Sequence, residues 1–485
     1  MARPPKIGLD RESGQKVSAL KALWPFLKPY RLNVIGAGLA LIFTASISLV
    51  LPIAARLIVD NFGADDGAML ARHFKTMMTF AGLLAVGTAL RYFLVTRLGE
   101  RIVADIRKAV FARMIGMSPA FYERVMTGEV LSRITTDTTL ILSVVGSSAS
   151  IALRNVLIFL GGVVLMLLTS VKMSIMVLWP IPVVLVPMII LGRRVRSQSK
   201  ENQDLIAESS GGASEQLLSA QTVQAFTHEE RSRAKFDDVT EQSYRSARRR
   251  IFTRSMLTAL VIFLVFSAIV LFLRMGSQDV RTGETTEGGL VQFMIYTIMV
   301  GGAVAALSEV WGELQRAAGA TERLVELLTI EDTVQDPAEP DAVVTPVKGG
   351  LVFDNVHFSY PSRIDIPALH GINLDIKPGE TVALVGPSGA GKSTMIHMVQ
   401  RFYDPQEGSV RIDGQDLRDM KRTAFRQHIA LVPQDPVIFA DTARENIRFG
   451  RPTATDAEVT QAAKAAAAHD FLTALPDGYD SYVGE

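Results

Sequence analysis

Six apolar stretches constrain this chain more than any other feature, because each is close to the roughly 20 residues that a helix needs to cross a bilayer. They lie at Val34 to Ala55, Thr76 to Val95, Ser150 to Thr169, Met173 to Leu191, Met256 to Leu273 and Leu290 to Val310. The chain of 485 residues is 48% hydrophobic and has a mean hydropathy above zero, although its last part has the composition of a polar, soluble domain. We therefore predict an all-α membrane domain with six transmembrane helices.

Basic residues predict the orientation of these spans. Arginine is concentrated between the second and third spans and between the fourth and fifth, whereas the other connections are short or contain acidic residues. Basic segments stay on the cytoplasmic side, so both termini and two long loops should be cytoplasmic. The two loops are rich in helix formers and poor in Gly and Pro, which predicts that the spans continue as helices beyond the bilayer. We expect an integral, multi-pass protein of the bacterial inner (plasma) membrane.

Two features of the membrane part have alternative interpretations. Residues 17–30 mix apolar and basic side chains, which is typical of a helix lying in the membrane interface; otherwise they are only the polar flank of the first span. Arg91 lies inside the second span, where a charge usually faces a cavity or a partner. Its long side chain could instead reach toward the interface.

A phosphate-binding loop follows the membrane part. Its pattern, G-x-x-x-x-G-K-[ST], is matched by Gly386, Pro387, Ser388, Gly389, Ala390, Gly391, Lys392 and Ser393, with Thr394 next. Glycines let the backbone N–H groups turn toward an anion, Lys392 supplies a charge for the outer phosphates, and the Ser393 hydroxyl is placed to bind Mg²⁺. The preceding strand-like run at 381–385 and the following helical pattern give the required order of strand, loop and helix. The chain should therefore bind a nucleotide.

The change of composition along the chain predicts four parts. We expect a polar tail at 1–16, the membrane domain at 17–330, an acidic linker containing proline at 331–348, and an α/β nucleotide-binding domain at 349–485. In the last part, strands are predicted at 351–353 and 356–360 with a turn at Asp354-Asn355, a hairpin at 409–413 and another strand at 428–432. The net charge of +1 gives no support to nucleic-acid binding, and the absence of cysteine excludes disulfides and thiolate metal sites.

With these motifs in place, the chain resembles one subunit of an exporter-type ABC transporter, in which six spans precede a nucleotide-binding domain. Tyr360, in the sequence Phe358-Ser359-Tyr360-Pro361, is similar to the aromatic residue that stacks on adenine in this family, which implies ATP as the nucleotide. Gln434 is similar to the glutamine that reaches Mg²⁺ and the attacking water, which implies a catalytic and a metal-binding role. Residues 121–137 and 215–230 resemble the family's two intracellular loops, whose tips dock on nucleotide-binding domains.

The resemblance also implies a function. A half transporter acts as a dimer, either a homodimer or a heterodimer with a related subunit, and couples ATP hydrolysis to export. The largely aliphatic spans are compatible with a hydrophobic or amphipathic cargo, such as a drug-like or lipid-like molecule, although surfaces facing membrane lipid would have the same composition.

The sequence departs from the family pattern at its end. It stops at Glu485, where the family continues into its signature motif and its acidic catalytic strand. We therefore expect a C-terminally truncated form of a longer transporter, which would bind ATP weakly and not hydrolyse it. The alternative function is that of a non-hydrolysing subunit, which binds ATP as a regulatory or inactive partner.

Overall fold

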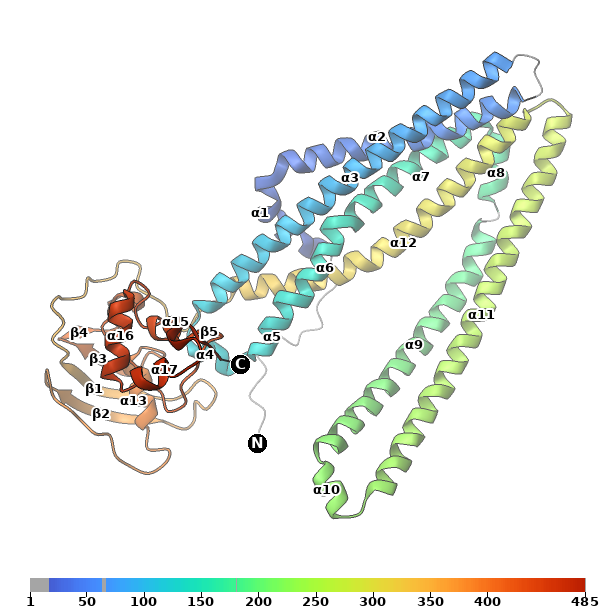
Figure 1. Cartoon of the computed structure of the whole chain (residues 1–485). Coiled ribbons are helices and arrows are strands. Elements are labelled where there is room, and N and C mark those ends of the chain that lie inside the picture. The colour runs from blue at the N-terminus through green and yellow to red at the C-terminus, as the bar shows by residue number, and fades with distance from the viewer. Residues whose placement is uncertain (1–16, 63–66, 180, 485) are drawn as a thin grey trace. The chain divides into compact units, whose positions relative to one another are not determined.

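The computed structural model describes residues 17–62, 67–179 and 181–484 (Figure 1). The expected polar tail at 1–16 lies outside these residues. Among the described residues the chain forms two compact units: a helical unit made of residues 17–109 and 133–325, and a second unit made of residues 110–132 and 326–484. The second unit thus includes a segment taken from between two of the expected spans.

The helical unit is built from long helices joined by short connections. Its elements are η1 (Val17–Leu23), α1 (Trp24–Leu27), η2 (Lys28–Tyr30), α2 (Arg31–Asp60), α3 (Gly67–Ile115), η3 (Arg133–Asp137), α6 (Thr138–Ser143), η4 (Val144–Ser148), α7 (Ala149–Thr169), α8 (Val171–Leu178), α9 (Ile181–Leu218), α10 (Ala220–Ala225), α11 (Glu229–Arg281) and α12 (Glu287–Thr329). The ends of α3 and α12 continue into the second unit.

Five helical stretches of the described chain are long and apolar enough to cross a membrane. They contain five of the six expected spans: the first, the second, the third, the fifth and the sixth. The fourth expected span falls on α8 and the start of α9, which are separated by residues 179 and 180, and residue 180 is outside the described part of the chain. The helical membrane domain is therefore as predicted, while the sixth crossing stays a prediction.

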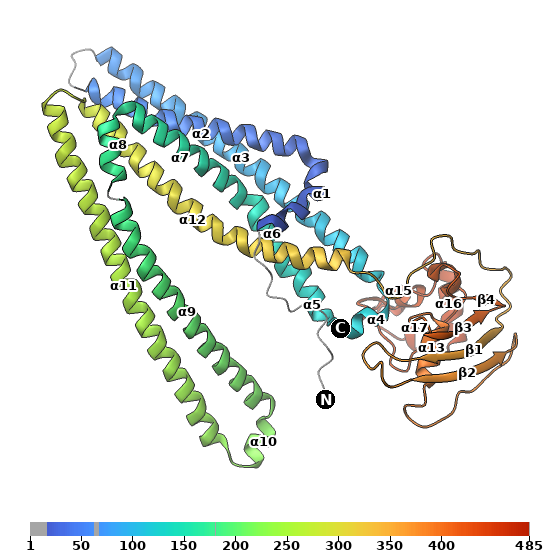
Figure 2. The ribbon, with the colours of Figure 1, turned by 180° about the vertical axis from the view of Figure 1, so that it is seen from behind.

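The second long loop is helical in the structure. Helices α9 and α11 lie side by side and are joined by the short helix α10, as Figures 1 and 2 show from opposite sides. At 1.5 Å per residue, the 53 residues of α11 extend over about 80 Å. This length exceeds the hydrocarbon thickness of a bilayer by more than a factor of two.

The short helical turns at 17–30 are tied to α3. The Tyr30 hydroxyl donates a hydrogen bond of 2.6 Å to Asp105, and the Arg101 guanidinium donates one of 3.0 Å to the Tyr30 oxygen. Leu23 is buried whereas Trp24 is 66% exposed, so this segment presents one apolar face inward and another outward. The helical conformation is confirmed, and its location in the membrane interface remains a prediction.

A close approach between two glycines fixes how α3 packs against the helices that follow it. A Cβ atom on Gly99 would lie 2.7 Å from the Cα atom of Gly146. Eight residues along each helix from this point, the Arg107 guanidinium donates a 2.9 Å hydrogen bond to the Thr138 hydroxyl. The two contacts define one antiparallel register between α3 and residues 138–154.

Gly99→Ala should therefore destabilise the helical unit by about 1–3 kcal/mol, because the added methyl meets backbone atoms that cannot rotate away. Gly82→Ala is the matched control, since no atom lies within 4 Å of a Cβ at that position of the same helix. Thermal unfolding in detergent should show a lower midpoint for the first variant and an unchanged or slightly higher midpoint for the second. Equal midpoints would contradict the register.

The second unit combines two short helices from residues 110–132 with an antiparallel sheet and further helices. Its elements are α4 (Pro119–Arg124), α5 (Thr127–Ser132), β1 (Leu351–Phe358), β2 (Leu369–Ile376), α13 (Lys392–Val399), β3 (Glu407–Ile412), β4 (Gln415–Asp416), α14 (Arg422–Arg426), β5 (Asp441–Thr442), α15 (Ala443–Arg448), α16 (Asp456–Ala465), α17 (His469–Thr473), η5 (Gly478–Asp480) and β6 (Tyr482–Val483). The strand order in the larger sheet is β2-β1-β3-β4. Its core contains Phe353, Val356, Phe358, Met398 and Phe425.

The sequence predicted the hairpin of this sheet correctly and one of its turns wrongly. β3 and β4 pair as a hairpin through Asp413 and Gly414, both of which have positive φ. The expected turn at Asp354-Asn355 is instead an irregularity within the single strand β1, where the register shifts and Asn355 has a φ of 46°. A polar pair with a left-handed residue suits a bulge as well as a turn, so the residue types alone did not distinguish the two.

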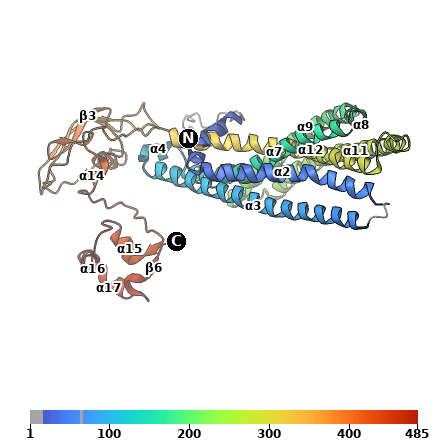
Figure 3. The same ribbon diagram turned by 90° about the horizontal axis from the view of Figure 1, so that it is seen from above.

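Two predicted strands do not form among the described residues. Residues 381–385 and 428–432 are irregular, and Val385 and Val432 are 88% and 92% exposed. Figure 3 shows the second of these segments within the irregular stretch that leads from α14 toward α15. Both segments have the continuous apolar character of buried parallel strands. A strand of this type is stable only between hydrogen-bonded neighbours, and neither segment has a strand partner in the described chain.

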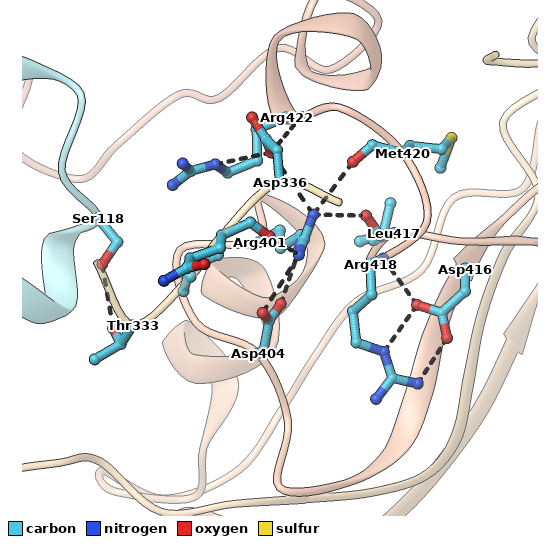
Figure 4. Close-up of polar contacts among 12 residues, drawn as sticks. Ser118, Thr333, Asp336, Arg401, Asp404, Asp416, Leu417, Arg418, Met420 and Arg422 are labelled. Atoms are coloured by element: carbon cyan, nitrogen blue, oxygen red, sulfur yellow. Dashed lines mark hydrogen bonds and ion pairs between the residues drawn. The ribbon is translucent and has the colours of Figure 1, made fainter. Parts of the chain in front are cut away.

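The acidic linker is held to the second unit through its carboxylates. Asp332 and Asp336 accept hydrogen bonds from the Arg422 guanidinium at 3.0 and 3.1 Å. The buried Arg401 guanidinium donates to the carbonyls of Leu417 and Met420 (Figure 4). It also donates to the carbonyl of Gln335 in the linker. The start of the linker is therefore part of the folded domain, although its composition predicted an exposed segment.

Asp413 binds the other end of this linker. Its carboxylate accepts backbone N–H bonds from Lys348, Gly349 and Gly350 at 2.7, 3.2 and 2.8 Å. Burial on its own would raise the pKa of Asp413, but these three donors outweigh it and lower the pKa below its usual value. The same carboxylate belongs to the β3–β4 turn, so it joins the entry of the domain to its sheet.

Candidate nucleotide site

The candidate site is the loop between residues 386 and 393, which is exposed and has the backbone conformation that its glycines predict. Gly386, Gly389 and Gly391 have φ angles of 156°, 85° and 88°. The loop leads directly into α13, which begins at Lys392. The first turn of a helix has no intrahelical acceptors for its N–H groups, so Lys392, Ser393 and Thr394 present backbone donors next to the loop. Such an arrangement suits a polyphosphate.

Gly391 is required for two separate reasons. Its φ of 88° is unfavourable for a residue with a side chain. In addition, a Cβ atom there would lie 2.7 Å from the Ala368 carbonyl oxygen and 2.8 Å from Leu369 Cδ2. The loop thus passes so close to the start of β2 that only glycine fits.

The Lys392 ammonium group folds back over the loop. Its Nζ donates hydrogen bonds of 2.7 Å to the carbonyl oxygens of Gly386 and Pro387. Both acceptors are neutral carbonyls in an exposed loop, and phosphate oxygens are stronger acceptors for an ammonium donor. The lysine is therefore positioned at the loop and can exchange these bonds for contacts with phosphate.

The side chains of the next two residues differ in environment. Ser393 is exposed, as a metal-binding hydroxyl has to be, whereas Thr394 is only 5% exposed. The Thr394 hydroxyl lies 2.9 Å from the Tyr360 hydroxyl. The Tyr360 ring packs edge-on against Phe358 and Tyr403, with centroid separations of 5.0 and 5.3 Å. The tyrosine expected to contact the base is thus joined to the helix that follows the loop.

Gln434 is not brought into this group of residues. It lies in the exposed irregular stretch between α14 and β5, and its side chain makes no hydrogen bond with any described residue. Among the described residues no cluster of three or more acidic, histidine or cysteine side chains could hold a metal ion. The hydroxyl of Ser393 is therefore the predicted Mg²⁺ ligand that the structure places at the loop.

The structure identifies the residues through which the first intracellular loop contacts the sheet, whereas the family resemblance implied only that the tip of such a loop docks on a nucleotide-binding domain. α4, from residues 110–132, packs into the core of the sheet through Ala120, which is 1% exposed. The Tyr403 hydroxyl donates a short hydrogen bond to the Glu123 carboxylate of the same helix. Burial, together with this negatively charged partner, raises the pKa of Tyr403. Tyr403 therefore contacts both α4 and Tyr360, and only the sequence position of Tyr403 just after α13 could have indicated this role.

His397 extends the same cluster on α13. Its Nδ1 lies 3.4 Å from the Tyr360 hydroxyl, and its ring is 6.2 Å from the ring of Tyr403. Burial lowers the pKa of His397 despite the opposing effect of Glu123. A lowered pKa favours the neutral imidazole at physiological pH.

Tyr403→Phe should loosen α4 from the sheet without disturbing the phosphate loop. The lost bond is to an exposed carboxylate, so we expect a loss of about 1 kcal/mol. This corresponds to about a fivefold faster hydrogen exchange in residues 119–124. Tyr482→Phe is the control, because Tyr482 is 67% exposed and its hydroxyl has no partner among the described residues. Equal exchange in the two variants would show that the Tyr403 hydroxyl does not hold α4.

Long apolar helices followed by a phosphate-binding loop on an α/β domain define a membrane protein with a nucleotide-binding domain. Comparison with known families specifies this class. Residues 34–304 match the family described as ABC transporter transmembrane region, and residues 369–481 match a second family described as ABC transporter. The chain therefore belongs to the ABC transporters, with the membrane domain and the nucleotide-binding domain of a half transporter fused in one polypeptide.

Relatives with curated descriptions align with nearly all of the chain. It is 31% identical over 485 residues to the mitochondrial potassium channel ATP-binding subunit of Rattus norvegicus, covering 96% of this chain and 66% of that protein. It is 29% identical to ABC transporter B family member 1 of Dictyostelium discoideum, covering 98% and 52%. It is 28% identical to a putative export ATP-binding/permease protein of Rickettsia prowazekii, covering 97% and 81%. The chain thus spans about half to four fifths of the length of these three relatives.

Proposed function

We propose that this protein takes part, as a dimer, in ATP-driven export of a hydrophobic or amphipathic molecule. The observation that carries this proposal is the composition of the second unit. Residues 110–132 lie between the second and third expected spans and overlap the ends of two long apolar helical stretches, and they belong to the same compact unit as the phosphate-binding loop. A nucleotide bound at the loop can thus act on a segment that continues directly into membrane helices.

Residues of the loop and its surroundings would hold the nucleotide. The N–H groups of the loop and of the first turn of α13 bind the phosphates, Lys392 neutralises their charge, and Ser393 binds Mg²⁺. Tyr360 contacts the base with its ring, and Gln434 orients the attacking water when its segment lies near the phosphates. ATP supplies the free energy of transport through the cleavage of its terminal phosphate.

In this proposal, the contacts of α4 transmit the effect of nucleotide binding to the membrane helices. Tyr360 touches Tyr403, and Tyr403 binds Glu123 of α4, so a change at the base site alters the contacts of that helix. The second loop tip, around α10, exposes Leu217, Leu218 and Phe226. Exposed apolar residues at such a tip fit docking on the nucleotide-binding domain of a second subunit. Dimerisation would then couple each membrane domain to two nucleotide sites.

The proposal also includes the orientation of the protein in the membrane and the class of its cargo. Arginine-rich segments favour a cytoplasmic location of both termini and of the nucleotide-binding domain. The name of the Rickettsia prowazekii relative contains both export and ATP-binding, and the name of the Rattus norvegicus relative contains ATP-binding. The first name supports an exporter rather than a soluble nucleotide enzyme. A cargo that partitions into the bilayer fits the aliphatic spans.

Uptake into inverted membrane vesicles tests this function. Vesicles from cells that produce the protein should accumulate a fluorescent amphipathic dye with Mg·ATP but not with ADP. Vesicles from cells with the Lys392→Ala protein should not respond to ATP. Accumulation that is the same with ATP and ADP, or that survives Lys392→Ala, would reject ATP-driven export.

A further inference from the structure

Residues 330–336, called here the junction segment, follow α12 and begin the linker. They are bound to the connection between α3 and α4 within the second unit. The Arg113 guanidinium, near the end of α3, donates a 2.7 Å hydrogen bond to the Ile330 carbonyl oxygen. The backbone N–H of Ser118, the N-cap residue of α4, donates a 3.1 Å bond to the Asp332 carboxylate. The Ser118 hydroxyl also lies 3.5 Å from the Thr333 hydroxyl (Figure 4).

Asp332 also joins the junction segment to the nucleotide-binding part of the unit. The carboxylate oxygen that accepts from Ser118 accepts a second bond, of 3.0 Å, from the Arg422 guanidinium of α14. The two side chains of this ion pair are only 9% and 15% exposed. Removing either partner of such a shielded pair leaves the other charge uncompensated. Asp332 therefore connects three segments that lie far apart in the sequence.

Arg401 joins the same segment to the helix that follows the phosphate loop. α13 begins at Lys392, ends at Val399 and is only eight residues long. Arg401 comes two residues later, and its φ of 49° is uncommon for a residue with a side chain. Its guanidinium is 4% exposed, is paired with Asp404 and donates a 2.8 Å bond to the Gln335 carbonyl oxygen. A displacement of α13 therefore displaces the junction segment as well.

The packing at the junction segment permits such a displacement. A cavity of about 470 Å³ borders the segment, and its lining includes Arg113, Met117, Asp332, Gln335 and Arg422. A close-packed interior would resist relative movement of these parts. Because the cavity leaves room for movement, the polar contacts determine where the segment lies.

We propose that the junction segment is a second connection between the nucleotide site and the membrane helices, with Asp332 as the residue that positions it. When a bound nucleotide displaces α13, Arg401 carries Gln335 with it. Asp332 fixes the remainder of the segment, so the displacement reaches α12 instead of being absorbed by a loose chain. The contacts of Tyr403 act on α4, whereas the junction segment continues directly into α12. Its role in transport rests on the proposed export function.

Hydrogen–deuterium exchange of the full chain in detergent, with and without saturating Mg·ATP, tests this connection. The readout is the ratio of the two exchange rates at residues 326–334, because a purely structural contact would change both rates equally. In the unchanged chain, nucleotide should slow exchange there by about threefold. Asp332→Asn keeps the shape of the side chain but loses the charge that holds Arg422, so the ratio should fall to about one. The affinity for nucleotide should change by less than about twofold, since Asp332 makes no contact with the phosphate loop.

Asp341→Asn is the matched control. Asp341 is an exposed residue of the same linker, and its carboxylate forms no ion pair with any described residue. Its ratio should equal that of the unchanged chain. If Asp332→Asn does not fold, Arg113→Gln replaces it, because this exposed arginine can be changed with loss of its bond to Ile330. The slowing by nucleotide should then fall from about threefold to below about twofold.

Two results would overturn the connection while leaving the nucleotide site intact. One is protection of residues 386–394 by Mg·ATP without any change at 326–334 in the unchanged chain. The other is the same exchange ratio in the Asp332 and Asp341 variants. Absence of protection at 386–394 would overturn the nucleotide site itself and this connection with it, so the two failures are distinguishable.

Discussion

Lys392→Ala should lower the affinity of the full chain for Mg·ATP by at least about tenfold. Lys392 is the cationic side chain that the structure places over the phosphate loop, with its Nζ 2.7 Å from the carbonyl oxygens of Gly386 and Pro387. A charge-assisted bond to phosphate contributes about 1.5–3 kcal/mol, which corresponds to about a tenfold to hundredfold change in affinity. The lysine is half-buried at the start of α13, so alanine should leave the helix intact.

Fluorescence of a trinitrophenyl derivative of ATP, titrated with the purified chain, measures this effect. Lys464→Ala is the control, because Lys464 is an exposed lysine of α16 that forms no ion pair with described residues. Its affinity should match that of the unchanged chain. Similar affinities for the Lys392 and Lys464 variants would mean that nucleotide binds away from the loop.

Gly391→Ala should have the second large effect, because it combines backbone strain with a steric clash. A side chain at a φ of 88° costs about 1–2 kcal/mol. The new methyl would also lie 2.7 Å from the Ala368 carbonyl oxygen, and displacing backbone in this way adds about 1–3 kcal/mol. We expect the loop to change conformation and nucleotide binding to fall below detection.

Gly389→Ala separates the two contributions. Gly389 has a similar φ of 85°, but no atom lies within 4 Å of a Cβ at this position. This variant should carry only the backbone strain and retain weak nucleotide binding. The thermal midpoint without nucleotide should follow the order unchanged chain, Gly389→Ala, Gly391→Ala. Equal midpoints of the two variants would show that the approach of the loop to Ala368 is not as close as described.

The phosphate loop and the membrane helices could be predicted from sequence because each depends on local information. The loop glycines encode their own φ angles, and a span is recognised from about 20 neighbouring residues. The bulge at Asn355 and the missing strands at 381–385 and 428–432 depend on partners far away in sequence, which local propensity does not report.

The functional links between segments were the least predictable part. The sequence of residues 119–124 does not predict that Ala120 enters the core of the sheet. It also does not predict that Glu123 accepts a hydrogen bond from Tyr403, which is 280 positions away in the sequence. Arg91 was recognised as an unusual charge inside a span, but its 2.7 Å hydrogen bond to the Ser150 hydroxyl depends on the approach of Gly99 to Gly146. Such pairings come from the packing of whole helices, which single-residue patterns do not specify.

The most direct test of the account is hydrogen–deuterium exchange of the full chain with and without Mg·ATP. Nucleotide bound at the proposed site should slow exchange at residues 386–394, and the contacts of Tyr360 and Tyr403 should carry part of this protection to α4 at 119–124. Residues 456–465 of α16 serve as the internal reference and should not change. Unchanged exchange at 386–394 would contradict the nucleotide site, and protection there without any change at α4 would contradict the coupling of the site to the membrane helices.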